Sequence, residues 1–253
     1  MEHSLAAEIR WPPRVTTPAD AVRFINAVSY CLLFPITRLP LPSLYYAVAR
    51  RDIHLGPSWD KSCQKIWRWK DELPHQRRAF YAKYFKLRGT FISLEMLPHF
   101  LAMRGTAAAA GDHERFYAAG RISHDARTIW ATLETHGPLA RLELRHACKM
   151  DSTAGNKRFA RAMAELQCLL AVVHFGAEQE TESWPSARFE LTARAFPKQV
   201  AAARKISPEA ARAALAEKYL EWHPDAQPIV LARLFGWTKG EVVEAIQGKR
   251  FVR

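Results

Sequence analysis

Positively charged side chains cluster on one predicted helix in the middle of the chain. Lys157, Arg158 and Arg161 fall within about one turn of a helix that the apolar spacing predicts over residues 156–168, opposite its apolar stripe. Arg145 and Lys149 come from a shorter helix predicted just before it, over residues 139–148. Cations on one helix face can neutralise successive phosphates and release their counterions, which makes binding sensitive to salt. The cluster predicts contact with DNA; the alternative is a solvated basic helix in a unit that binds only protein.

A second basic tract runs from residue 61 to residue 88, with Asp71 and Glu72 as its acidic residues. Its cations are interleaved with aromatic residues, a combination that binds single strands by stacking unpaired bases while the cations follow the backbone. The alternative is that most of these rings form core, since Phe80, Tyr84 and Leu87 have the spacing of one helix face. The aromatic residues in the tract and just before it are Trp59, Trp67, Trp69, Tyr81, Tyr84 and Phe85. The cations predicted to attract the DNA backbone are Lys61, Lys65, Arg68, Lys70, Arg77, Arg78 and Lys83.

Motifs for metal or nucleotide chemistry are missing from the sequence, and its two Ser-x-x-Lys matches, at Ser58 and Ser62, lack the Ser-Asp-Asn and Lys-Thr-Gly that accompany a nucleophilic serine. The sequence contains no Gly-x-Gly-x-x-Gly and no phosphate-binding loop ending in Gly-Lys-Ser/Thr, and His113-Glu114 lacks the second histidine of a zinc-protease helix. The four cysteines lie far apart, with no Cys-x-x-Cys pair, which argues against a zinc knuckle and a disulfide framework. We therefore expect no metal site and no cofactor.

The composition is that of a folded, strongly basic protein. Of 253 residues, 49% are apolar, and 37 Lys and Arg against 25 Asp and Glu give a net charge of +12. Such a charge favours polyanionic partners, of which nucleic acid is the most abundant in a bacterial cytosol. No apolar run approaches the roughly 20 residues that span a bilayer, and the first residues lack the order of a secretory signal. We expect a cytoplasmic protein without a membrane partner, associated with the nucleoid if it binds DNA.

The middle of the chain has the element order of a winged helix. Helices are predicted over residues 124–136, 139–148 and 156–168, followed by a strand over 169–175, a hairpin tip at 184–186 and a returning strand over 187–191. Three helices and a two-stranded hairpin are the parts of a winged helix, whose third helix lies in the major groove of DNA.

Further helices precede and follow that unit. Thr17 and Asp20 have capping-box spacing for a helix over about 18–33; a short helix follows at 43–48, and an apolar helical pattern runs from 91 to 103. Near the C-terminus, helices are predicted from 208, over 228–235 and from 238 to 247, leaving room for at most one strand. The last helix carries Lys239, Glu241, Glu244 and Gln247, and its carboxylates would repel phosphate, so we interpret it as structural or interaction surface.

The predicted fold class is mainly α with small β-hairpins, built from tandem winged-helix (helix-turn-helix) units. We divide the chain into an N-terminal helical or winged-helix-like unit (1–105), a linker (106–120), a winged helix (121–200) and a C-terminal partial winged helix (201–253). Duplex DNA is the expected partner.

This order of units, with a first helix beginning Pro18-Ala19-Asp20-Ala21-Val22-Arg23 and a tract Trp67-Arg68-Trp69-Lys70-Asp71-Glu72-Leu73-Pro74, resembles the bacterial winged-helix DNA glycosylases of the AlkZ/YcaQ type. The resemblance implies DNA binding and, in that family, excision of alkylated bases and unhooking of crosslinks by a Gln-x-Gln or Gln-x-Asp motif. The matching stretch here is Phe24-Ile25-Asn26-Ala27-Val28, so phenylalanine takes the glutamine position and Asn26 the second position.

This departure bears on catalysis, because base excision needs a group that positions and polarises a water. Phenylalanine cannot exchange a proton, and Asn26 offers an amide but no negative charge. We therefore expect a DNA-binding protein without glycosylase activity, with Asn26 as the one catalytic candidate. In the alternative interpretation, Phe24 and Val28 share a buried face and Asn26 points to solvent. The alternatives are a divergent glycosylase that uses Asn26 or another residue, and a protein-interaction scaffold.

Overall fold

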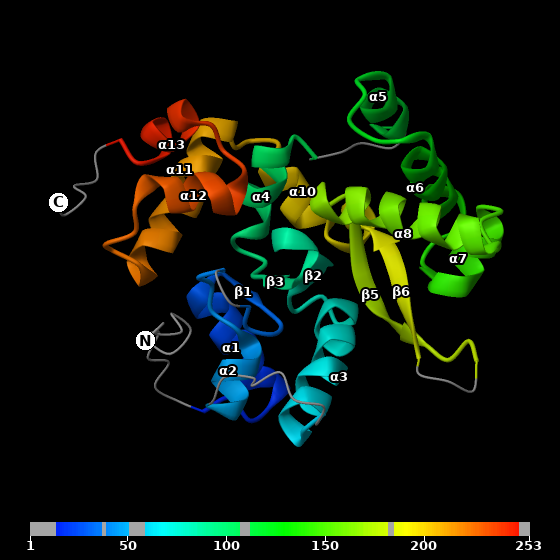
Figure 1. The fold of residues 1–253 in the computed structure, drawn as a ribbon, viewed down its shortest axis with the longest axis horizontal. Helices are drawn as coiled ribbons and strands as arrows, with labels where there is room; N and C mark the ends of the chain where they lie inside the picture. Colours follow the sequence, from blue (N-terminus) through cyan, green and yellow to red (C-terminus); the bar gives the residue numbers. More distant parts are fainter. Residues whose placement is uncertain (1–13, 37–38, 51–58, 107–111, 182–184, 248–253) are drawn as a thin grey trace.

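The structure is a computed structural model that describes residues 14–36, 39–50, 59–106, 112–181 and 185–247 (Figure 1). Short helices dominate these residues, with two small antiparallel sheets between them. No helix in these ranges is long and apolar enough to cross a membrane.

Within the described residues, the first unit consists of three helices and three strands, and the strands form one sheet. In chain order they are α1 (Pro18–Val28), β1 (Tyr30–Leu32), α2 (Leu44–Ala49), α3 (Lys61–His75), β2 (Phe80–Lys83) and β3 (Gly89–Ile92). A 3-10 turn, η2 (Phe85–Leu87), joins β2 to β3. The strands lie in the order β1-β3-β2 with antiparallel pairing. Its α1, α2 and α3 therefore stand in the positions of the three helices of a winged helix, with β2 and β3 as the wing.

The second unit repeats this topology element by element. It comprises α6 (His124–His136), β4 (Leu139–Ala140), α7 (Arg141–Ala147), α8 (Thr153–Cys168), β5 (Val172–Glu178) and β6 (Ser186–Leu191). Its strands lie in the order β4-β6-β5, the counterpart of β1-β3-β2. The helical fold class with small hairpins and tandem winged-helix units is thus confirmed. In each unit the third helix, α3 or α8, holds the recognition position.

The remaining helices link and extend these two units. They are α4 (Leu97–Arg104), α5 (Asp112–Ala118), α9 (Thr192–Ala195), α10 (Pro197–Ala203), α11 (Pro208–Trp222), α12 (Pro228–Phe235) and α13 (Lys239–Ala245). Helix α5 lies within residues 106–120, which we had predicted to be a linker. Up to residue 247, where the described part of the chain ends, no strand follows α13. The strand allowed after it falls on residues outside the described ranges.

Side-chain caps set the starts of several helices where the sequence predicts them. Thr17 and Asp20 form the predicted capping box of α1, and Thr238 and Glu241 form that of α13. The hydroxyl of Ser123 accepts the Ala126 N–H at the start of α6. Helix α8 begins three residues before the predicted position, because Ser152 caps it there.

In the N-terminal part of the chain, three predictions of local structure are wrong. The first helix stops at Val28, because Ser29 has a φ of 64° and leads into β1. The helical pattern at 91–103 is helical only from Leu97, and its start belongs to β3. Phe80 lies in β2 and Leu87 in the 3-10 turn, so the helix face predicted for them does not exist. In each case strand pairing overrides local spacing, between the distant β1 and β3 or within the β2–β3 hairpin.

The second winged helix has a core of its own, and the C-terminal helices share one with the first. Most buried apolar residues between Phe116 and Leu191 form one cluster, whereas another joins β1–β3, α4 and part of β5 to α10–α13. In that shared core Tyr30 meets Phe100 and Phe235 edge-on and donates a hydrogen bond to the Leu215 carbonyl, at 3.0 Å. Figure 1 shows α11 beside α4. The proposed boundaries at 105 and 200 stay predictions.

The two winged helices contact each other directly, with β5 packed along α3 (Figure 1). At this contact the Asp71 carboxylate accepts hydrogen bonds from Lys70 Nζ, at 2.6 Å, and from the buried His174 of β5. The C-terminal end of α8 meets β2, where Lys83 N donates to Gln167 Oε1 at 2.9 Å. The wing of the second unit therefore covers part of the recognition helix of the first.

Candidate nucleic-acid interface

Helix α8 buries one face and presents the opposite face to solvent. Phe159 and Met163 are buried in the core of the second unit, while Lys157 and Arg161 are exposed. The helix sits close to the preceding turn at Gly155, where a Cβ atom would lie only 2.6 Å from the carbonyl oxygen of Met150. The structure thus places Lys157 and Arg161 one turn apart on an uncovered surface, as the sequence predicts.

Arg158, the third predicted cation of α8, is exposed but forms an ion pair on the protein surface. Its Nε donates to Asp125 Oδ2 on α6 at 2.8 Å, and its Nη2 bonds Oδ1 of the same carboxylate. This contact lowers the pKa of Asp125 and raises that of Arg158. The paired charges cancel, so Arg158 adds less attraction for phosphate than Lys157 or Arg161.

The two other predicted cations of this region, Arg145 and Lys149, differ in their exposure and contacts. Arg145 is half-buried and donates to the carbonyl oxygens of Met150, at 3.4 Å, and Asp151, at 3.0 Å, so it fastens the turn between α7 and α8. Lys149 lies in that turn and is exposed. Among the described residues, Lys149, Lys157 and Arg161 have no ion-pair partner.

In the first unit the predicted cations are divided between surface and interior. Lys61, Arg68 and Lys83 are exposed. Lys65 donates to the Thr16 carbonyl at 3.3 Å. Lys61, Lys65 and Arg68 all project from α3.

The structure counts against phosphate contact by Lys70. This residue is 7% exposed, with its Nζ between the Trp67 ring and the Asp71 carboxylate, and burial lowers its pKa. Arg77 is also engaged, donating to the Ala195 carbonyl at 3.0 Å, and Arg78 is half-buried. Lys70 and Arg77 therefore belong to the contact with the second unit, Lys70 through Asp71 and Arg77 also against the Phe175 ring.

The aromatic residues of the same tract mostly form core. Trp69, Tyr81, Tyr84 and Phe85 are buried, which favours the core interpretation for those four. The two other tryptophans, Trp59 and Trp67, are 44% and 37% exposed. Sequence spacing did not separate these two groups.

The stretch that matches the glycosylase motif lies on α1. Phe24 and Val28 are buried, at 2% exposure each, and Asn26 faces solvent. Asn26 thus does not line a buried site in the described structure. Within the described ranges there is also no group of three or more His, Cys, Asp or Glu side chains placed to hold a metal ion.

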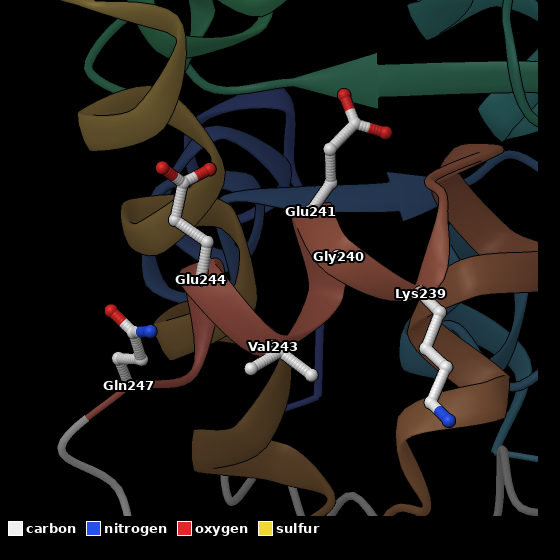
Figure 2. Close-up of a pocket in the computed structure, with 6 residues that line it drawn as sticks. All are labelled: Lys239, Gly240, Glu241, Val243, Glu244 and Gln247. Atoms are coloured by element: carbon white, nitrogen blue, oxygen red, sulfur yellow. The ribbon is translucent and has the colours of Figure 1, made fainter.

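A shallow depression lies on α13, the last helix. Figure 2 shows its lining residues, with the carboxylates of Glu241 and Glu244 turned away from the Lys239 side chain. Both carboxylates bond the guanidinium of Arg212 on α11, at 3.3 and 2.9 Å. The lining residues are Lys239, Gly240, Glu241, Val243, Glu244 and Gln247. This acidic face is a poor surface for phosphate, in line with the sequence interpretation.

Comparisons with known proteins agree with this architecture. The profile of a family described as AlkZ related matches residues 15–236. The solved structure of Streptomyces sahachiroi DNA glycosylase AlkZ superposes with a TM-score of 0.54 at 12% sequence identity, covering 96% of this chain and 63% of that one. This chain therefore spans less than two thirds of that structure, and the likeness is one of fold. No curated protein matches the sequence.

Proposed function

The chain belongs to the AlkZ-related family, as the sequence resemblance indicated, and from this premise we propose that it is a DNA-binding protein that contacts duplex DNA through the solvent face of α8. In this proposal it has the fold of a DNA repair glycosylase without the base-excision activity. A cytoplasmic location at the nucleoid would follow from that role.

The observation that carries the proposal is that α8 exposes cations with no ion-pair partner among the described residues. Its N-terminal half exposes Lys157 and Arg161 without ion-pair partners in the described structure, and Lys149 stands in the turn before it. Its C-terminal half is anchored on the first unit through Gln167. A recognition helix that packs on the protein with one face and exposes unpaired cations on the other is suited to enter a major groove while its cations meet the flanking phosphates.

The proposed lack of glycosylase activity rests on side-chain chemistry at α1. Phe24 is apolar and buried, so it can neither accept nor donate a proton to activate a water. Asn26 is exposed and carries no charge that would offset the developing sugar cation. Phosphate contacts through α8 do not depend on either residue.

Two measurements test the proposal. Fluorescence anisotropy with a labelled duplex across a salt series should give a logarithm of the binding constant that falls linearly with the logarithm of salt concentration. Absent or salt-independent binding would favour the protein-interaction scaffold instead. Incubation with alkylated or crosslinked duplex, followed by alkali, should leave the strands intact; strand cleavage that disappears in Asn26→Ala would establish the divergent glycosylase.

A further inference from the structure

Two large aromatic side chains remain open to solvent at the recognition helix of the first winged helix. Trp59 precedes α3 and Trp67 lies on it, 44% and 37% exposed. Their rings meet edge to face, with centroids 5.3 Å apart and an interplanar angle of 78°. By contrast, Trp69, two residues along the same helix, is 1% exposed and belongs to the core. The open pair leaves indole surface that the fold does not use.

A buried ion pair stands beside this tryptophan pair. Lys70 Nζ lies 4.3 Å from the Trp67 ring centroid and 2.6 Å from Asp71 Oδ1. His174 bonds the same oxygen, so two donors fix the carboxylate. Asp71 follows Trp67 by one helical turn and its side chain is 21% exposed. Its other oxygen, Oδ2, has no hydrogen-bond partner among the described residues and can act as an acceptor.

The surroundings favour a polyanion. Lys61 and Arg68 project from the same helix, are exposed, and pair with no acidic residue in the described ranges. The neighbouring carboxylates are engaged locally: Asp60 accepts from Cys63 N at 2.7 Å, and Glu72 accepts from Gln76 Nε2 at 3.2 Å. Aromatic faces flanked by free cations are the combination that binds exposed bases on a phosphate backbone.

We propose that Trp59, Trp67 and Asp71 form a binding site for an unpaired nucleobase, with Lys61 and Arg68 contacting the adjoining phosphates. The site goes beyond the proposed function, which assigns only duplex contacts and only to α8. A base stacks on the exposed indole surface, and Asp71 Oδ2 accepts an N–H hydrogen bond from the base edge.

The chemistry selects an unpaired base over a paired one. An ionised carboxylate only accepts hydrogen bonds, and the ring N–H of thymine or guanine is free to donate to it only when the base has no pairing partner. Stacking on a side chain likewise needs a base that has left its own stack. Two sources share this chemistry, a single strand and a base extruded from a duplex.

The test compares four fluorescein-labelled probes by anisotropy. They are a 12-nucleotide oligothymidylate, an abasic strand of equal length, an intact duplex, and a duplex with one bulged thymine. The protein should bind the oligothymidylate roughly tenfold or more tightly than the abasic strand, because only the former offers bases to stack. Tighter binding of the bulged than of the intact duplex would add the extruded base as a source; equal binding of the two duplexes would assign the site to single strands.

Variants assign the effect to this surface. Trp67→Ala should reduce the preference for oligothymidylate over the abasic strand to near unity, whereas Trp67→Phe should keep it, because a phenyl ring still stacks. Tyr117→Ala, at a ring that is 38% exposed on α5, is the matched control and should change nothing. Lys157→Ala with Arg161→Ala should weaken intact-duplex binding while leaving the preference unchanged, which separates this site from α8. Equal binding of the two strands by the wild-type protein, or an unchanged preference in Trp67→Ala, would overturn the proposal.

Discussion

Removing the three unpaired cations around α8 should flatten the salt dependence of duplex binding by a calculable amount. Lys149, Lys157 and Arg161 are exposed and free of ion pairs within the described structure, whereas Arg158 is neutralised by Asp125 and Arg145 fastens a turn. If each free cation meets one phosphate, the triple alanine variant loses about 2.7 from the slope of log K against log salt. Between 50 and 200 mM salt, this corresponds to about a 40-fold smaller loss of affinity.

The assay is fluorescence anisotropy of a labelled duplex at several salt concentrations. It compares wild-type protein, the triple variant and a control that keeps the wild-type net charge. The control is Asp125→Ala with Arg158→Ala, which removes a surface ion pair and leaves the net charge unchanged. Its slope should equal that of the wild-type protein. A triple variant with the wild-type slope would show that these cations do not meet phosphates, and a control as flat as the triple variant would show that Arg158 does.

Two further predictions concern stability. Burial lowers the pKa of His174 below its ordinary value, so below about pH 6.5 the unfolded chain takes up a proton that the folded protein does not, and the free energy of unfolding decreases as the pH is lowered. His174→Gln should therefore lose less stability than wild type between pH 7.5 and pH 5.5 in urea denaturation, and an equal loss would contradict this. Gly155→Ala should lower stability by about 1–3 kcal/mol, because its Cβ would press on the Met150 carbonyl; thermal unfolding at the wild-type midpoint would disprove that clash.

Local signals in the sequence were sufficient for much of the second winged helix. Ser123 caps α6 and Gly137 ends it, and the stripe around Phe159 matches the buried face of α8. These features act within a few residues, so spacing and capping rules capture them. The first unit was harder because β1 and β3 are short and pair across about sixty residues, from Tyr30 to Ile92. Nothing local marks Tyr30 as a strand residue.

The sequence predicts the candidate site as a set of cations. Long-range contacts in the fold decide which of these cations are paired or buried and which stay free. Arg158 is paired by Asp125, which lies 33 positions earlier, and Lys70 is buried where β5 covers α3. Periodicity says which residues share a face of one helix, but not which face another unit will cover. For the same reason Trp67 could not be separated from Trp69 until the fold placed one outside and the other inside.

Lysine footprinting in the presence of duplex DNA tests the central claim most directly. Acetylation followed by mass spectrometry reports each lysine separately, and Lys149, Lys157 and Lys239 are all exposed in the free protein. If duplex DNA lies along α8, it should protect Lys149 and Lys157 several-fold and leave Lys239 on α13 as reactive as before. Protection of Lys239 with full reactivity at Lys157 would contradict the assignment of α8 as the DNA-contacting helix.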